Sequence, residues 1–136
     1  MTATSADVPP ERPTVLIADD EAALTDSMAV WLSDHYRVRT AYTGHEALRE
    51  FDPTVDVVLL DRHMPGLSGE RVMEELNETD VNPRVALLTA TSADDFGPEV
   101  EELGFDSLLT KPISRDELLE AVSALLARPS NPRGAD

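Results

Sequence analysis

The sequence predicts an α/β fold in which a central parallel β-sheet lies between two layers of helices. Short apolar segments typical of buried strands alternate with segments whose apolar residues recur at helical spacing, which gives five strand-helix units. Most of the strand segments are apolar over nearly their whole length. That pattern is expected for parallel strands that helices cover on both faces of the sheet.

The five predicted strands are short and separated by helical segments. They span residues 14–18, 36–41, 55–60, 84–90 and 106–110. The second strand differs from the others because its apolar and polar residues alternate, with Tyr36, Val38 and Thr40 on one face. The others read as continuous Val, Leu, Ile and Ala runs, typical of strands in a sheet's interior.

A helix is predicted after each strand, over residues 22–34, 43–51, 68–78, 98–104 and 114–127. Thr43 and Ser114 stand where an N-cap is expected, because their hydroxyl groups can accept a hydrogen bond from the first helical turn. The fourth helix is predicted to have at most two turns, since Pro98 opens it and Gly104 closes it.

Length and composition indicate one domain. The 136 residues contain 41% hydrophobic residues, and we expect a domain over residues 14–127 with flexible tails over 1–13 and 128–136. The absence of cysteine excludes disulfides and thiolate metal sites. No apolar run approaches the roughly 20 residues of a membrane span, and the first residues lack the features of a signal peptide. We therefore expect a cytoplasmic location.

The formal net charge is -16. A surface this acidic repels phosphate groups, which argues against direct binding to nucleic acid or to an anionic membrane. Two interpretations of the charge remain: a solvated acidic surface without special meaning, or adaptation to high salt. The second is favoured because acidic residues are spread along the chain rather than gathered in one tail.

Chemically distinctive residues follow the predicted strands. Asp19, Asp20 and Glu21 follow the first strand and Asp61 the third, Thr89 lies at the end of the fourth, and Lys111 follows the fifth. In open α/β sheets, ligands bind beyond the carboxyl ends of the strands. We therefore expect these side chains to converge at one edge of the sheet.

Asp19, Asp20 and Asp61 would form an acidic cluster if the strands bring them together. Two carboxylates about 4 Å apart repel each other by about 4 kcal/mol at an effective dielectric constant near 20. Such a cluster either holds protons or binds a positive ion. Because its ligands are oxygens, the ion expected is Mg²⁺, with Mn²⁺ as an alternative. Each aspartate alone could instead be an ordinary helix N-cap.

Lys111 is the only lysine in the chain, whose other ten basic residues are arginines. A compact ammonium suits contact with a single anionic oxygen in a tight site better than a planar guanidinium does. Thr89 would add a hydroxyl donor to the same anion. Ala90 is small and would leave room for an incoming group.

The segments ADDE, LLDRHMPGLSG, LLTA and TKP stand at the ends of the first, third, fourth and fifth strands in that order. In this combination the chain resembles the receiver domain of two-component response regulators, over about Thr14 to Ala127. In its acidity and in the segment DRHMPGLSG, the chain resembles haloarchaeal receivers of the HalX type. The resemblance implies a flavodoxin-like, doubly wound (βα)5 fold with strand order 2-1-3-4-5.

The resemblance also implies roles for the matching residues. Asp61 would accept a phosphoryl group, and Asp20 and Asp61 would bind Mg²⁺ directly. Asp19 would act mainly through metal-bound water, and the main-chain carbonyl of His63 would be a further metal ligand.

Lys111 and Thr89 would contact the phosphoryl oxygens. The expected function is a phosphorylation-dependent switch, which takes its phosphoryl group from a sensor histidine kinase or phosphotransfer protein and passes the signal to an output protein or domain by contact. It would catalyse only its own phosphorylation and dephosphorylation.

Leu108 departs from that family pattern, and three other positions are candidate modulators. Leu108 stands where receivers commonly have an aromatic residue that turns inward when the threonine shifts, so the switch pair would be Thr89 and Leu108. The side chains of His63 and Thr91, with Ala90, are candidates for modulating hydrolysis of the phosphoryl group. For His63 a plain exposed loop residue is an equal alternative.

Other functions stay open at this stage. A haloacid-dehalogenase-type phosphatase also uses an aspartate nucleophile and Mg²⁺, but it needs a second aspartate where this chain has His63. A flavodoxin-like carrier needs a phosphate-binding loop after the first strand, where this chain has acidic residues. A degenerate receiver that acts only as a binding module is argued against by the complete acidic set and Lys111.

Overall fold

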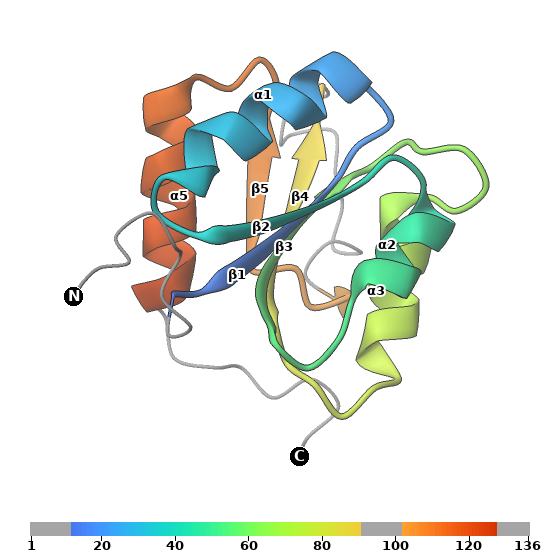
Figure 1. Ribbon diagram of the computed structural model, residues 1–136. Helices are drawn as coiled ribbons and strands as arrows, with labels where there is room; N and C mark the ends of the chain where they lie inside the picture. Colours follow the sequence, from blue (N-terminus) through green and yellow to red (C-terminus); the bar gives the residue numbers. More distant parts are fainter. Residues whose placement is uncertain (1–11, 91–101, 128–136) are drawn as a thin grey trace.

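The computed structural model describes residues 12–90 and 102–127, and within them the sheet has five parallel strands in the order β2-β1-β3-β4-β5 (Figure 1). The strands are β1 (Thr14–Ala18), β2 (Arg37–Ala41), β3 (Val55–Asp61), β4 (Arg84–Thr89) and β5 (Ser107–Thr110). The predicted strand order is therefore confirmed. It places β1 and β3 side by side in the centre, so that Asp19 and Asp61 leave neighbouring strands.

Helices cover both faces of this sheet, as Figure 1 shows. The helices α1 (Ala22–Ser33) and α5 (Arg115–Ala127) pack on one face, and α2 (Gly44–Glu50) and α3 (Gly69–Asn77) on the other. The doubly wound α/β class predicted from the apolar strand runs is confirmed. Because each central strand lies between helix layers, neither of its faces meets water.

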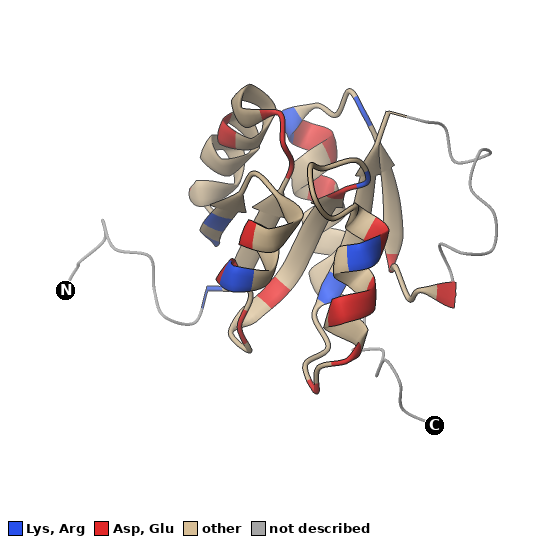
Figure 2. Ribbon diagram, turned by 90° about the vertical axis from the view of Figure 1, so that its right-hand side faces the viewer, with Lys and Arg blue, Asp and Glu red and all other residues tan. Residues whose placement is uncertain are grey.

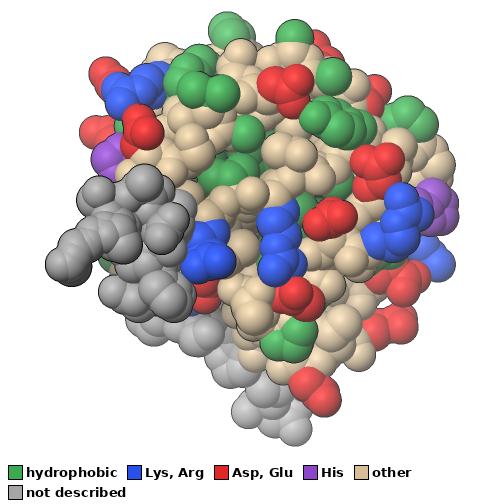
Figure 3. All heavy atoms as spheres, in the orientation of Figure 1, with side chains coloured by type: hydrophobic (Ala, Val, Ile, Leu, Met, Phe, Trp, Pro, Cys, Tyr) green, Lys and Arg blue, Asp and Glu red, His purple; other side chains and the backbone are tan. Residues whose placement is uncertain are grey.

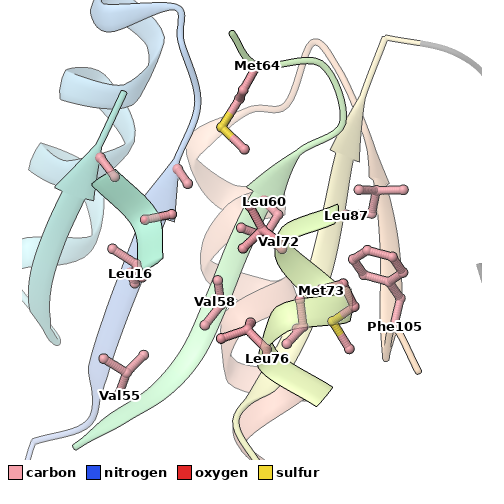
Figure 4. Close-up of a cluster of buried hydrophobic side chains, with 14 residues drawn as sticks. Leu16, Val55, Val58, Leu60, Met64, Val72, Met73, Leu76, Leu87 and Phe105 are labelled. Atoms are coloured by element: carbon pink, nitrogen blue, oxygen red, sulfur yellow. The ribbon is translucent and has the colours of Figure 1, made fainter. Parts of the chain in front are cut away.

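Two hydrophobic cores result from the alternation of side chains along the buried strands. Leu16, Val58 and Leu87 point toward α2 and α3, where they pack with Met73 and other members of the cluster drawn in Figure 4. Val15, Leu59 and Leu88 belong to the opposite core under α1 and α5. The uninterrupted apolar runs in the sequence are therefore two interleaved sets, one for each face.

The predicted helix caps are present. Thr43 Oγ1 accepts a hydrogen bond from Glu46 N at 3.1 Å, and the Glu46 side chain accepts one from the backbone N–H of Tyr42. Ser114 and Glu117 cap α5 reciprocally, through Glu117 N to Ser114 Oγ at 3.1 Å and Ser114 N to Glu117 Oε1 at 2.9 Å. These contacts satisfy backbone donors that a helix start leaves without partners.

Some predicted boundaries move by one residue. Tyr36 precedes β2 because its backbone N–H bonds to Leu32 O and so closes the turn after α1. Asp106 precedes β5, where its carboxylate accepts a hydrogen bond from Val85 N and its own N–H bonds to Val85 O. The fourth helix, predicted over 98–104, lies largely outside the described residues, as do both predicted tails except for residues 12 and 13.

Acidic residues are distributed over the whole described fold, with basic ones between them (Figures 2 and 3). Several basic residues are paired, such as Arg62 with Glu70 and Arg39 with Asp52. Across the described stretches, none of the helices is both long and apolar enough for a transmembrane segment.

Candidate functional site

The site lies at the carboxyl edge of the sheet, where β1 and β3 end beside each other (Figure 1). Asp19 and Asp20 follow β1, and Asp61 is the last residue of β3. Each of the three aspartates offers one carboxylate oxygen, and these oxygens lie within 4.8 Å of one another. The predicted convergence of the three acidic residues is confirmed.

Asp19 is held rigidly by the turn that joins β1 to α1. Its carboxylate is fully buried, and Oδ1 accepts a hydrogen bond from Glu21 N at 3.0 Å. The hydroxyl of Thr25 donates to Asp19 O at 2.8 Å and also bonds to Glu21 O. The first turn of α1 is therefore tied to the end of β1, which fixes the direction of the Asp19 side chain.

Asp61 is fixed by the close return of the β3–α3 loop. Arg62 N bonds to Leu88 O at 2.9 Å and Gly69 N bonds to Arg62 O at 2.9 Å, which brings the start of α3 against the end of β3. A Cβ atom on Gly69 would lie 2.5 Å from Asp61 O, closer than real Cβ contacts come. Glycine is therefore required at position 69 for this approach.

Lys111 reaches the acidic residues from the far side of the site. Its backbone N–H bonds to Thr89 O at 2.8 Å, which continues the pairing of β5 with β4 past the last strand residue. Its ammonium Nζ lies 2.7 Å from Asp19 Oδ2 and 3.0 Å from Asp61 Oδ1. The only lysine of the chain thus faces the aspartates, as the sequence predicted.

Glu21 also belongs to this site, and its contact with Lys111 was not predicted. Its Oε1 atom accepts a hydrogen bond from Lys111 Nζ at 3.0 Å, across 90 residues of sequence. The signal that could have identified it was its position directly after the aspartate pair. The sequence placed Glu21 with Asp19 and Asp20 at this edge of the sheet but predicted no chemical role for it.

Burial changes the acid-base properties of the site. Desolvation raises the pKa of Asp61 to about 6, and the charges of Asp19 and Asp20 act in the same direction, while the contact with Lys111 lowers it. For Lys111, burial lowers the pKa, but its contacts with Asp19, Glu21 and Asp61 outweigh burial and raise the pKa above its ordinary value. Lys111 is thus firmly cationic, whereas a part of Asp61 is protonated near neutral pH.

The acidic cluster fits a small divalent cation. Asp19 Oδ2 is buried and receives no well-aligned hydrogen bond from the described residues, although the Lys111 ammonium lies close to it. Two oxygens that bind one Mg²⁺ at about 2.1 Å are at most about 4.2 Å apart, so these carboxylates need little movement to share an ion. The donor set is all oxygen, which Mg²⁺ and Mn²⁺ accept.

The other predicted positions are placed as follows. Thr89 ends β4 and is buried, beside the strand that carries Asp61. Leu108 lies on β5 opposite Leu87 and packs in part against the core under α2 and α3. Ala90 and the side chain of His63 are exposed, and His63 lies in the loop that follows Asp61. Thr91 is outside the described residues.

Sequence comparison finds relatives over most of this chain. A Haloferax volcanii protein named "Putative transcriptional regulator" is 45% identical over 115 residues, which is 84% of this chain and 19% of that protein. The transcriptional regulatory protein CiaR of Streptococcus pneumoniae is 35% identical over 115 residues, 84% of this chain and 51% of CiaR. The chain therefore spans about half, or less, of the length of these relatives.

Structural comparison gives the same result. The solved receiver domain of DrrB activated by BeF3 is 30% identical and superposes with a TM-score of 0.78, over 86% of this chain and 99% of that one. The profile of the response regulator receiver domain matches residues 15–123. With its five-stranded 2-1-3-4-5 sheet and the acidic cluster beside Lys111, the chain belongs to the response regulator receiver domain family.

Proposed function

We propose that this domain is a phosphorylation-dependent switch and that Asp61 is its phospho-acceptor. The observation that carries the proposal is the position of Lys111 Nζ, 3.0 Å from Asp61 Oδ1 and 2.7 Å from Asp19 Oδ2. A buried ammonium beside a strand-end carboxylate is suited to stabilise negative charge on a group that is transferred to that carboxylate.

The proposed reaction is the transfer of a phosphoryl group to an Asp61 carboxylate oxygen. The bond between phosphorus and the donor nitrogen of a kinase phosphohistidine breaks, its electron pair stays on the imidazole, and a new phosphorus–oxygen bond forms. Hydrolysis later returns the carboxylate and inorganic phosphate. Asp61 has to be ionised to attack, and Lys111 favours its ionised form through the contact at 3.0 Å.

Mg²⁺ would be held by Asp20 and Asp61 directly and by Asp19 mainly through water, with the His63 carbonyl as a further ligand. The ion would neutralise charge on the transferring group. The rigid attachment of Asp19 to the α1 turn supports its part in this set, because a fixed carboxylate needs no ordering when the ion arrives.

The signal would be transmitted by Thr89 and Leu108. Thr89 is buried at the end of β4 next to the acceptor strand, which supports a role in which its hydroxyl follows a phosphoryl oxygen. Leu108, only partly buried against the core, would change its packing with it. The proposed partners are a histidine kinase or phosphotransfer protein, and an output domain or protein reached by contact.

The rival functions are less well supported by this geometry. A phosphatase of the haloacid dehalogenase type would need an aspartate two residues after Asp61, where this chain has the exposed His63. A receiver that has lost phosphorylation would not need Lys111 in contact with Asp19, Glu21 and Asp61 at once.

The test is incubation with acetyl phosphate and Mg²⁺, followed by intact mass spectrometry. We expect the wild-type protein to gain the mass of one phosphoryl group. We expect no added mass when Mg²⁺ is chelated before incubation, and none in Asp61→Asn. Asp26→Asn is the matched control, because it makes the same chemical change at an exposed residue of α1 that bonds only to Tyr42 among the described residues. A wild-type protein that gains no mass, or an Asp61→Asn protein that does, would contradict the proposal.

A further inference from the structure

We propose that Glu21 is a displaceable partner of Lys111. In the resting state the Glu21 carboxylate binds the Lys111 ammonium, and it leaves the ammonium when the phosphoryl group arrives. The inference rests on the proposed phosphorylation of Asp61 and adds a residue and a step to it. Glu21 would be a positioning residue, since it acts through Lys111 and does not touch the transferred group.

The argument begins with the number of donors on Lys111. An ammonium has three N–H groups and no more. In this structure it hydrogen-bonds to Glu21 Oε1 and Asp61 Oδ1, both at 3.0 Å, and it forms a third, less well aligned contact with Asp19 Oδ2 at 2.7 Å. Three carboxylates therefore surround the ammonium, two of them hydrogen-bonded to it and the third paired with it by charge. A phosphoryl oxygen would be a fourth acceptor, so one carboxylate has to withdraw.

The exposure of the three carboxylates indicates which one withdraws. The Asp19 side chain is 0% exposed and is held by Glu21 N, and the Asp61 side chain is 8% exposed and carries the phosphoryl group itself. The Glu21 side chain is 63% exposed. Water can solvate the released Glu21 carboxylate, whereas moving Asp19 away from Lys111 would deprive a fully buried charge of this partner.

The position of Glu21 also favours its release. Glu21 is the N-cap residue of α1, its side chain makes no capping hydrogen bond, and the first turn of α1 contains no acidic residue. A carboxylate that leaves Lys111 therefore remains beside a helix N-terminus, where the helix dipole favours negative charge. The exchange replaces one anion at Lys111 by another, so that the ammonium has an anionic partner in both states.

A consequence is that Glu21 competes with the phosphoryl group for Lys111. An exposed ion pair of this kind contributes up to about 1 kcal/mol, so its removal should strengthen binding of a phosphoryl mimic by roughly fivefold. We propose to measure binding of beryllium trifluoride to the Mg²⁺-loaded protein, for wild type and Glu21→Gln. The measurement is made in 1 M KCl, where the Debye length is about 3 Å and only contact interactions persist.

Asp26→Asn is again the matched control, because it removes one negative charge from α1 without touching Lys111. We expect its affinity for beryllium trifluoride to equal that of the wild type in 1 M KCl, while that of Glu21→Gln is about fivefold higher. Equal affinities for all three proteins, or weaker binding by Glu21→Gln, would overturn the inference.

A second measurement observes the exchange itself. Because Lys111 is the only lysine, labelling lysine with ¹⁵N gives a single side-chain ammonium signal by NMR. We expect this signal to differ between wild type and Glu21→Gln in the free proteins, and to coincide once both have bound beryllium trifluoride. A difference that persists in the bound state would show that Glu21 stays on Lys111 and would overturn the inference.

The two proposals fail in different ways. If wild type binds no beryllium trifluoride and gains no phosphoryl group, the proposed function fails and the inference fails with it. If wild type binds and is phosphorylated, but Glu21→Gln behaves like Asp26→Asn, only the role of Glu21 is refuted. The exposure of Glu21 makes the substitution compatible with folding, which an unchanged circular dichroism spectrum would verify.

Discussion

The raised pKa of Asp61 predicts that the acceptor carboxylate destabilises the metal-free fold at neutral pH. The pKa of Asp61 is about 6 in the folded protein against an ordinary value of 3.8, chiefly because of burial. Between these two values the unfolded chain has released the proton and the folded protein still holds it. The folded state then binds more protons than the unfolded state, so stability falls as pH rises through this window.

The magnitude follows from the size of the shift. Each pKa unit corresponds to 1.36 kcal/mol, and a shift of about 2 units therefore lowers the free energy of unfolding by about 3 kcal/mol between pH 4 and pH 6. Above pH 6 both states are ionised and the loss stays constant. Asp61→Asn has no such proton, so this loss should be absent from it.

The assay is urea unfolding of wild type and Asp61→Asn at several pH values between 4 and 7.5, in buffer with a chelator. Taking the difference between the two proteins cancels the titration of all other groups to a first approximation. We expect Asp61→Asn to gain about 3 kcal/mol relative to wild type across this range. With excess Mg²⁺ this pH-dependent difference between the two proteins should become smaller, since the ion favours the ionised carboxylate of Asp61. A difference that does not vary with pH would refute the reasoning.

Four further changes have expected outcomes. Lys111→Arg should slow phosphorylation by acetyl phosphate about tenfold or more, measured by intact mass, because a planar guanidinium cannot repeat the contacts of the ammonium with Asp19 and Asp61; an unchanged rate would contradict this. Gly69→Ala should lower the free energy of unfolding, measured by urea denaturation, by about 1–3 kcal/mol, because its Cβ would overlap Asp61 O. An unchanged free energy would show that the loop between β3 and α3 shifts to accommodate the methyl group. His63→Ala should change the lifetime of the phosphoryl group on Asp61, which is measured as the rate at which the added mass disappears. An unchanged lifetime would show that His63 is a plain exposed loop residue. Molar KCl should raise the melting temperature, because the net charge of -16 repels itself less when screened; equal melting curves in low and high salt would remove the case for salt adaptation.

The fold was predictable because local pattern and topology agree in this chain. The apolar runs of β1, β3 and β4 can be satisfied only between two helix layers, and strands that alternate with helices form a parallel sheet. The caps of α2 and α5 were visible as Thr43 and Ser114 for the same reason, since capping depends on residues within one turn. Boundaries moved where a tertiary contact decided them, as with Asp106 and its two hydrogen bonds to Val85.

The site was predictable only in part. Parallel strands bring their carboxyl ends to one edge, so the meeting of Asp19, Asp20 and Asp61 followed from the order of the elements. The contact of Glu21 with Lys111 did not, because an exposed side chain next to two aspartates has no periodicity that distinguishes it. Its role depends on where the ammonium of a residue 90 positions away comes to lie.

The sequence by itself determined the class of fold, the edge of the sheet that carries the chemistry and the identity of the acidic and basic groups there. These depend on side-chain type and on periods of two and 3.6 residues, which a linear chain already contains. Tertiary structure alone decided the three contacts of Lys111, the raised pKa of Asp61 and the need for glycine at position 69. The reason is physical: desolvation, donor saturation and close approach arise only when distant segments are packed together and water has been excluded.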